Sequence, residues 1–147
     1  MRYWMIRNPY IHNTWREILF RERFVLTGIR NIYSQKQIKS MSVGDLAIFY
    51  DKQSKEFKGI LEVHEPPKRD YTASESDLFC VEFRLHSVFN NPVHIDHLKS
   101  SPVPTSSLFF RQPRFTVVEA SPECYRVILK IITPNNALYQ NLAVYDV

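Results

Sequence analysis

One segment of the chain, residues 28–37, combines the kinds of side chain that proteins use to read a nucleotide. A side-chain amide can pair with both a donor and an acceptor on a base edge, an arginine can hold a phosphate, and an aromatic ring can stack on a base. The segment supplies these groups in Arg30, Asn31 and Tyr33. Polar loops of this composition are common, and a solvent-exposed start of a helix would explain the same residues.

A second basic cluster, Arg111-Gln112-Pro113-Arg114, stands at the start of a β-rich stretch. Its two arginines could form the other wall of a basic cleft. Surface arginines beside a proline turn are the more frequent explanation, so this cluster decides nothing alone.

Patterns typical of enzymes are missing from the sequence. There is no phosphate loop, no Rossmann glycine pattern and no nucleophile elbow. His94 and His97 share a spacing of three residues, but no cysteine or glutamate nearby completes a zinc set. We therefore predict a protein that is not an enzyme and that uses no metal and no cofactor.

Length and composition indicate one globular domain over residues 1–147. Hydrophobic residues make up 44% and charged residues 23% of the 147 residues, which excludes a disordered or fibrous protein. The net charge is only +4, but residues 1–42 hold eight basic and two acidic side chains. This concentration would suit a polyanionic partner if the residues share one face; solvated surface charge explains it equally well.

The redox and membrane features favour an intracellular protein. Cys80 and Cys124 lack a paired spacing, which indicates buried, reduced thiols. No apolar run is long enough to span a membrane, and the first residues lack a secretory signal. We expect a cytoplasmic protein, or a nuclear one in a eukaryote, without a membrane partner.

The elements that must position the polar segments are mostly short strands. Residues 79–86 alternate between apolar and polar, as a half-buried strand does. Similar β-rich patterns cover residues 2–7, 24–29, 45–50, 58–64 and 114–119. Gly59 lies inside one of these runs, which predicts a bulge or a close backbone approach, and Gly28 ends another where a ligand could come near the main chain.

Two or three helices accompany these strands. Thr14 and Glu17 have the spacing of a capping box, and Ser121 followed by Pro122 predicts a helix that runs to about residue 131. A shorter helical turn is expected over residues 94–99. About six strands with so few helices favour an α+β fold with a mixed or antiparallel, strongly curved sheet or small barrel.

A series of short motifs follows one order along the chain. It runs Tyr3-Trp4-Met5-Ile6-Arg7 with Pro9, Thr14-Trp15, Gly28-Ile29-Arg30-Asn31, Met41-Ser42-Val43-Gly44-Asp45-Leu46 with Phe49-Tyr50, Gly59-Ile60-Leu61-Glu62-Val63, Pro92-Val93, Arg111-Gln112-Pro113-Arg114-Phe115-Thr116-Val117 and Ser121-Pro122-Glu123. Together these motifs resemble the EVE domain, a member of the PUA-like superfamily related to the YTH domain. The resemblance covers residues 1 to about 130 and leaves 131–147 as a C-terminal extension.

The resemblance implies a PUA-like fold, a small curved β-barrel with flanking helices. It also implies nucleic-acid binding, particularly of DNA with a modified cytosine that swings out into a pocket beside the barrel. Unstacking such a base costs a few kcal/mol, which stacking and edge hydrogen bonds must recover.

The site residues follow from matching the family motifs position by position. The family's Gly-Val-Arg-Asn stretch falls on residues 28–31 and its Arg-Gln-x-Arg stretch on residues 111–114. The expected base pocket comprises Trp4, Gly28, Ile29, Arg30, Asn31, Tyr33, Ser34 and Tyr50. The expected contacts to the nucleic-acid backbone are Arg7, Arg30, Lys36, Arg111, Gln112 and Arg114.

The chain departs from the family pattern at the predicted pocket. Leu26 stands where the family usually has tryptophan, and residues 33–36 read Tyr-Ser-Gln-Lys in place of a more typical Gln-Ala-Arg-Asn. These departures bear on which ligand is bound more than on the fold.

Three alternatives stay open from the sequence. The first is an RNA-binding PUA-like module. The second is an enzyme or small-molecule binder for a nucleotide-like ligand, with Asn31, Glu62 or His64 in its site. The third is a scaffold whose tail, with Leu138, Tyr139, Leu142 and Tyr145, contacts another chain.

Overall fold

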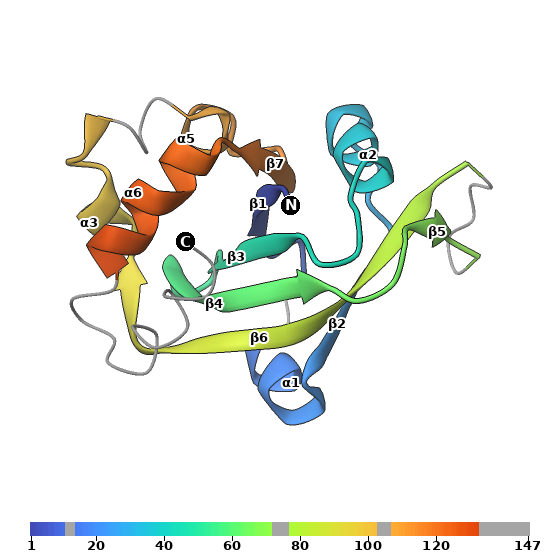
Figure 1. Cartoon of the computed structure of the whole chain (residues 1–147), viewed down its shortest axis with the longest axis horizontal. Helices are drawn as coiled ribbons and strands as arrows, with labels where there is room; N and C mark the ends of the chain where they lie inside the picture. The colour runs from blue at the N-terminus through green and yellow to red at the C-terminus, as the bar shows by residue number, and fades with distance from the viewer. Residues whose placement is uncertain (11–13, 72–76, 103–106, 133–147) are drawn as a thin grey trace.

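The fold is built on one seven-stranded sheet, seen in Figure 1. The computed structural model describes residues 1–10, 14–71, 77–102 and 107–132. The strands are β1 (Tyr3–Arg7), β2 (Arg23–Leu26), β3 (Leu46–Asp51), β4 (Glu56–Val63), β5 (Lys68–Arg69), β6 (Phe79–His94) and β7 (Val117–Ala120). The helices are α1 (Thr14–Arg21), α2 (Ile32–Lys39), α3 (Ile95–Leu98), α5 (Leu108–Arg111) and α6 (Pro122–Ile132).

The sheet is mixed, mostly antiparallel and open. Its strand order is β2-β6-β4-β3-β1-β7, with β5 paired to β6. The pair β1–β3 is parallel and the other pairs are antiparallel. The predicted α+β class is confirmed. Over the described residues no pairing joins β2 to β7, so the strands form an open, curved sheet where a closed barrel was expected.

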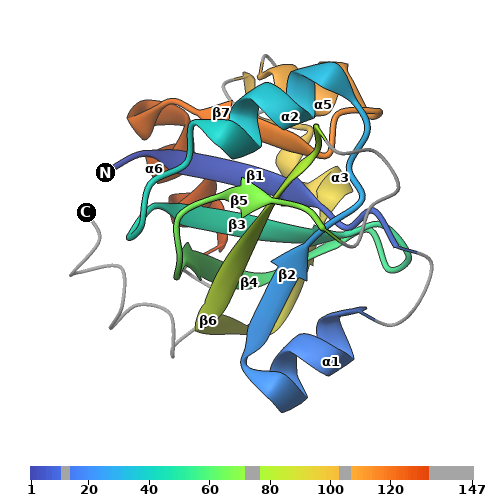
Figure 2. The same cartoon turned by 90° about the vertical axis from the view of Figure 1, so that its right-hand side faces the viewer.

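Helix α2 lies across the open side of the sheet, where it contacts β7 and β6 (Figure 2). The Ser34 hydroxyl accepts hydrogen bonds from the backbone N–H groups of Thr116 and Val117, at 3.1 and 3.4 Å. On the next residue, the Gln35 amide donates to the carbonyl of Phe79 at 3.1 Å and accepts from its N–H at 2.9 Å. Neighbouring side chains of one helix thus join both sides of the opening.

Hydrophobic residues are buried on both faces of the sheet. Along β1, Trp4 and Ile6 pack into one cluster while Met5 packs into the other, as the alternation of a strand requires. Helix α6 covers the Met5 side with Tyr125 and Ile128. Its predicted cap is confirmed, because the Ser121 hydroxyl accepts a hydrogen bond from the Cys124 N–H at 3.1 Å.

Gly59 lies where two elements meet closely, as the sequence predicts. A Cβ at this position would clash with the backbone oxygen of Ser87 and come within 2.7 Å of the Trp15 ring. The register of β4 against β6 also shifts next to Gly59. The absence of a side chain therefore lets α1 press its tryptophan onto the sheet.

Most predicted elements are present, with changed bounds. All six predicted strands exist, although β6 continues to His94 where the alternation predicts an end at residue 86. Helices α2 and α5 and the short β5 were not predicted as elements. Cys80 and Cys124 are free and buried, and burial raises the pKa of both thiols. None of the helices described here is long and apolar enough to cross a membrane.

Candidate functional site

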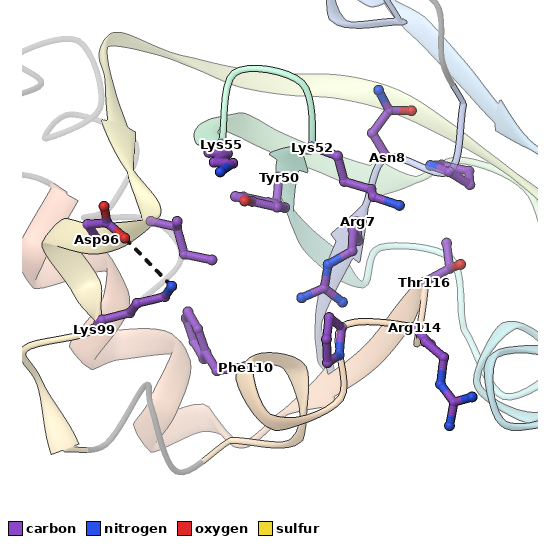
Figure 3. Close-up of a pocket in the computed structure, with 13 residues that line it drawn as sticks. Arg7, Asn8, Tyr50, Lys52, Lys55, Asp96, Lys99, Phe110, Arg114 and Thr116 are labelled. Atoms are coloured by element: carbon purple, nitrogen blue, oxygen red, sulfur yellow. Dashed lines mark ion pairs between the residues drawn. The ribbon is translucent and has the colours of Figure 1, made fainter.

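A cavity of about 550 Å³ opens where β1 and β3 end side by side (Figure 3). Because these strands are parallel, Arg7 and Tyr50 come to the same edge of the sheet. The turn between β3 and β4, helix α3 and the connection from α5 to β7 complete the walls. The lining residues are Arg7, Asn8, Pro9, Tyr50, Lys52, Lys55, Ile95, Asp96, Lys99, Phe110, Pro113, Arg114 and Thr116.

Arg7 provides a buried positive charge on this wall. Its side chain donates to the carbonyls of Phe115 and Phe109, each at 2.8 Å, and lies 4.0 Å from the centre of the Phe109 ring. Burial lowers its pKa, and the guanidinium has no carboxylate partner among the described residues. A cation buried without a counter-ion favours an anion or an acceptor-rich ligand beside it.

Two N–H groups of Arg7 remain for such a ligand. The observed bonds use Nη1 and one hydrogen of Nη2. Within the described residues, the Nε–H and the second Nη2 hydrogen have no acceptor. Figure 3 shows the guanidinium at the edge of the open space.

Aromatic rings face this space from two sides. Tyr50 lies on the side of the β3–β4 turn and half-buried Phe110 on the opposite side (Figure 3). Tyr50 is held by packing on Phe57 and Phe109, with ring centroids 5.0 and 5.8 Å away. Its burial raises the pKa of the phenol, so the hydroxyl is neutral and can donate a hydrogen bond.

Lysines and one more arginine surround the mouth of the cavity. Lys52, Lys55, Lys99 and Arg114 are all exposed. Asp96 is the single acidic residue of the lining, and it pairs with Lys99 at 3.6 Å. The mouth is therefore positively charged.

The turn that carries Lys52 is fixed to the end of β1. The Asn8 N–H donates to the carbonyl of Tyr50 at 2.9 Å. The buried Asp51 carboxylate accepts from the Asn8 amide at 3.4 Å and from the Ser54 hydroxyl at 3.0 Å. Asn8 and Asp51 hold the wall in shape before any ligand binds.

A second cavity of similar size differs in charge. It has a volume of about 590 Å³ and lies between α1 and β2. Its lining has two cations, Arg21 and Arg23, and two acids, Glu17 and Glu82, whereas the first cavity has five cations against Asp96. The first cavity therefore carries the greater positive charge, a property that suits a polyanionic ligand.

The predicted site residues fall into those that line the cavity and those that do not. From the predicted base pocket only Tyr50 lines it, and from the predicted backbone contacts Arg7 and Arg114 do. Trp4 and Ile29 lie in the core; Trp4 is fully buried and donates to the Asp45 carboxylate at 3.0 Å, so it does not line this space.

Other residues of the 28–34 segment make contacts within the protein, and one of these contacts reaches the cavity wall. Asn31 caps α2 by accepting from the Ser34 N–H at 2.9 Å, and buried Ser34 binds the N–H of Thr116, which does line the cavity. Tyr33 stacks on Phe115 with ring centroids 4.3 Å apart. The Gly28 N–H donates to the Asp70 carboxylate at 2.9 Å.

The predicted backbone contacts lie mainly beside the cavity. Arg30 is exposed just before α2, Lys36 is exposed on α2, and Arg111 is exposed at the end of α5. The Gln112 carbonyl accepts a long bond of 3.5 Å from Arg7. These four residues do not line the cavity, whereas the other two predicted backbone contacts, Arg7 and Arg114, do.

Sequence reasoning missed the wall formed by the turn and α3. Asn8 directly follows the first strand, and Lys52 and Lys55 lie in the turn after the third. Parallel pairing of β1 with β3 brings the residues that follow the two strands together, so their polar types could have predicted this wall. Asp96, Lys99 and Phe110 carry no comparable pattern.

Comparison with known proteins places the chain in a family. The model of the EVE domain matches residues 2–131. The chain belongs to the EVE domain family. No curated protein matches this EVE domain protein.

Several solved structures share the fold of this EVE domain. The protein Rpa0253 from Rhodopseudomonas palustris has a TM-score of 0.82 and 21% identity over 90% of this chain and 94% of its own. Human THYN1 protein, in complex with 5-methylcytosine containing DNA, has a TM-score of 0.78 and 14% identity over 89% and 97%. The YTH domain of Zygosaccharomyces rouxii MRB1 protein, in complex with N6-methyladenosine RNA, has a TM-score of 0.56 and 19% identity over 89% and 86%.

Proposed function

We propose that this EVE domain is a nucleic-acid-binding module that holds one extruded base, a modified cytosine in DNA, in the cavity at the ends of β1 and β3. The observation that carries the proposal is the buried Arg7 guanidinium. It has free N–H groups, lacks a carboxylate partner among the described residues and stands in a cavity ringed by cations.

The size and walls of the cavity suit a base. Ligand pockets usually enclose about 300–1,000 Å³, and this cavity has a volume of about 550 Å³. Extruding a base costs a few kcal/mol, while stacking on an aromatic ring contributes roughly 1–3 kcal/mol per base. Phe110 and Tyr50 supply the rings, and the Arg7 donors can bind acceptors such as O2 and N3 of cytosine.

The exposed cations suit the phosphates on either side of that base. In the part of the chain that the structure describes, Lys52, Lys55 and Arg114 form no ion pair. A phosphate therefore need not displace an internal partner. Arg111, which is exposed and three residues before Arg114, would extend the contact along the nucleic-acid strand.

The choice of modified cytosine in DNA rests on human THYN1, which shares the fold and is complexed with 5-methylcytosine containing DNA. The YTH domain complexed with N6-methyladenosine RNA favours the second candidate, an RNA-binding module that uses the same cavity. We propose binding without catalysis, because the one carboxylate in the lining, Asp96, is exposed and paired with Lys99.

The test is the affinity of the protein for short fluorescent oligonucleotides. Matched DNA and RNA strands, with 5-methylcytosine, N6-methyladenine or no modification, are titrated at two salt concentrations. We expect the 5-methylcytosine DNA to bind at least about tenfold more tightly than the unmodified strand, a difference of about 1.4 kcal/mol. Equal affinity for all strands would overturn modified-base reading.

A matched pair of arginine variants tests the position of the site. Arg114→Ala removes an exposed arginine at the cavity, and Arg16→Ala removes an exposed one from α1. Loss of one phosphate contact should reduce the salt dependence of binding by about one counter-ion in Arg114→Ala only. Equal effects of both variants would show a general basic surface without a defined site.

A further inference from the structure

Three side chains of the types that bind metal ions lie close together at the end of β4 that is opposite the cavity. His64 directly follows β4, Glu65 is the next residue, and Glu82 lies in β6. One donor atom from each lies within 4.8 Å of the other two. Since β3 and β4 are antiparallel, this end of β4 is remote from the end of β3, where Tyr50 lines the cavity.

The sheet fixes two of the donors opposite each other. The His64 N–H donates to the carbonyl of Glu82 at 2.9 Å, which continues the pairing of β4 with β6. Two residues back, Glu62 faces Arg84 in register and binds it at 3.1 Å. Because side chains two residues apart share a face, His64 and Glu82 share the face that shows this ion pair.

Glu82 already has an orienting partner. Arg23 of β2 donates to its Oε2 at 2.7 Å, while no bond engages Oε1 within the described residues. A neighbour that holds one carboxylate oxygen directs the other toward a ligand, as residues around metal sites commonly do. Only 21% of the Glu82 side chain is exposed, so its conformations are limited.

Glu65 can complete the set by a small movement. It precedes Pro66 and Pro67, and a residue before proline prefers extended backbone. Zinc binds imidazole nitrogen and carboxylate oxygen at about 2.0–2.2 Å. Donors within 4.8 Å must close slightly around such an ion, and the exposed Glu65 side chain has room to turn.

From this convergence we infer that His64, Glu65 and Glu82 form a binding site for a divalent transition metal of the zinc class. The imidazole selects against magnesium and calcium, which take oxygen ligands. The two carboxylates balance the charge of the ion, and solvent completes its coordination. A bound ion would tie the connection from β4 to β5 onto β6, and the site is independent of the nucleic-acid cavity.

The test uses ZnCl₂ and the full, untagged chain in isothermal titration calorimetry. The wild type should bind a single equivalent, and His64→Ala and Glu82→Gln should each bind at least about tenfold more weakly. MgCl₂ should show no binding. Zinc should also raise the melting temperature of the wild type by more than it raises that of His64→Ala, since a ligand that binds the folded state stabilises it.

The matched control is His97→Ala, which removes an exposed histidine from α3 and should bind zinc as the wild type does. Circular dichroism of each variant checks that it folds. If Glu82→Gln loses structure, Glu65→Gln replaces it as the test, because Glu65 is exposed. Absence of zinc binding by the wild type, or equal affinity in wild type and His64→Ala, would overturn the inference.

Discussion

Arg7 joins structure and binding in one side chain. It fixes the carbonyls of Phe109 and Phe115, which shape the connection from α5 to β7, and it presents its remaining N–H groups to the cavity. A lysine could not replace it, because a single ammonium lacks the planar fork that reaches two carbonyls and a ligand at once.

We predict that Arg7→Met lowers the free energy of unfolding by about 3 kcal/mol, because buried carbonyls lose their charged donor. Urea denaturation at pH 7 measures the change. Arg114→Met is the matched control: it lines the same cavity but makes no hydrogen bond within the described residues, so its effect should stay within about 0.5 kcal/mol. Equal losses in the two variants would contradict the structural role of Arg7.

A surface ion pair gives a prediction for pH. The hydrogen bonds from Arg2 lower the pKa of Glu119 on β7, at 2.9 and 2.7 Å. A carboxyl whose pKa is lower in the folded state stabilises the fold above its unfolded pKa, and this contribution is lost as the pH falls through the folded pKa. Because both side chains are about 40% exposed, solvent screening limits the gain to at most about 1 kcal/mol.

Glu119→Gln should therefore reduce the free energy of unfolding by up to about 1 kcal/mol at pH 7 and by progressively less as the medium becomes acidic. Urea titrations of both proteins between pH 7 and pH 3 would show this convergence. A difference that is constant over the whole range would rule out the ion pair as its cause.

The sequence predicted single residues best where a local pattern forces one solution. Gly59 and the Ser121 cap are such cases, since backbone crowding and an orphan N–H each demand a particular residue type. Trp4 was expected at the pocket, yet it is buried against Asp45. Aromatic residues serve cores and pockets alike, so residue type could not separate the two uses.

Among the elements, α2 links two strands that do not pair with each other, β7 and β6. Its residues Ser34 and Gln35 bind the edges of β7 and β6 in turn. The helix was not predicted because its apolar face is narrow: beyond Ile38, the buried positions are Ser34 and Gln35, which the sequence presents as a polar loop. The groups that hydrogen-bond to these buried side chains belong to Phe79 and Thr116, which are distant in sequence.

We predict that Gln35→Leu lowers the free energy of unfolding by about 2–3 kcal/mol. The change leaves the partly buried N–H and carbonyl of Phe79 and the buried carbonyl of Ile29 without their partner. Gln37→Leu, on the same helix and without a side-chain hydrogen bond within the described residues, should change it by less than about 0.5 kcal/mol. Urea denaturation measures both changes. A loss in Gln35→Leu no larger than that in Gln37→Leu would contradict the bridging role of α2.

At the scale of the whole molecule, the fold brings positively charged residues that are distant in sequence together around one cavity. The basic excess in residues 1–42 predicted a polyanionic partner, but of the eight basic residues in that region only Arg7 lines the cavity. The other cations come from the turn after β3, from the residue that follows α3 and from the connection between α5 and β7. Pairing between β1 and β3, which are distant in sequence, decides where these residues meet.

Family motifs predicted the fold because they record such long-range pairing, and the EVE domain match over residues 2–131 confirms the family. The alternation and helix caps are local patterns, so they could predict where strands and helices lie but not whether the sheet closes into a barrel. The first two residues of the predicted extension, 131–147, belong to α6, and the remainder with the predicted tail contact lies outside the described residues.

The most direct test of nucleic-acid binding at the cavity is NMR mapping of backbone amides while a 5-methylcytosine DNA strand is added to the 17.4 kDa protein. We predict the largest shifts at Asn8, Lys52, Lys55 and Thr116, which line the cavity between β1, β3 and α3. Shifts confined to Arg21, Phe24 and Val25, around the cavity between α1 and β2, would contradict this location.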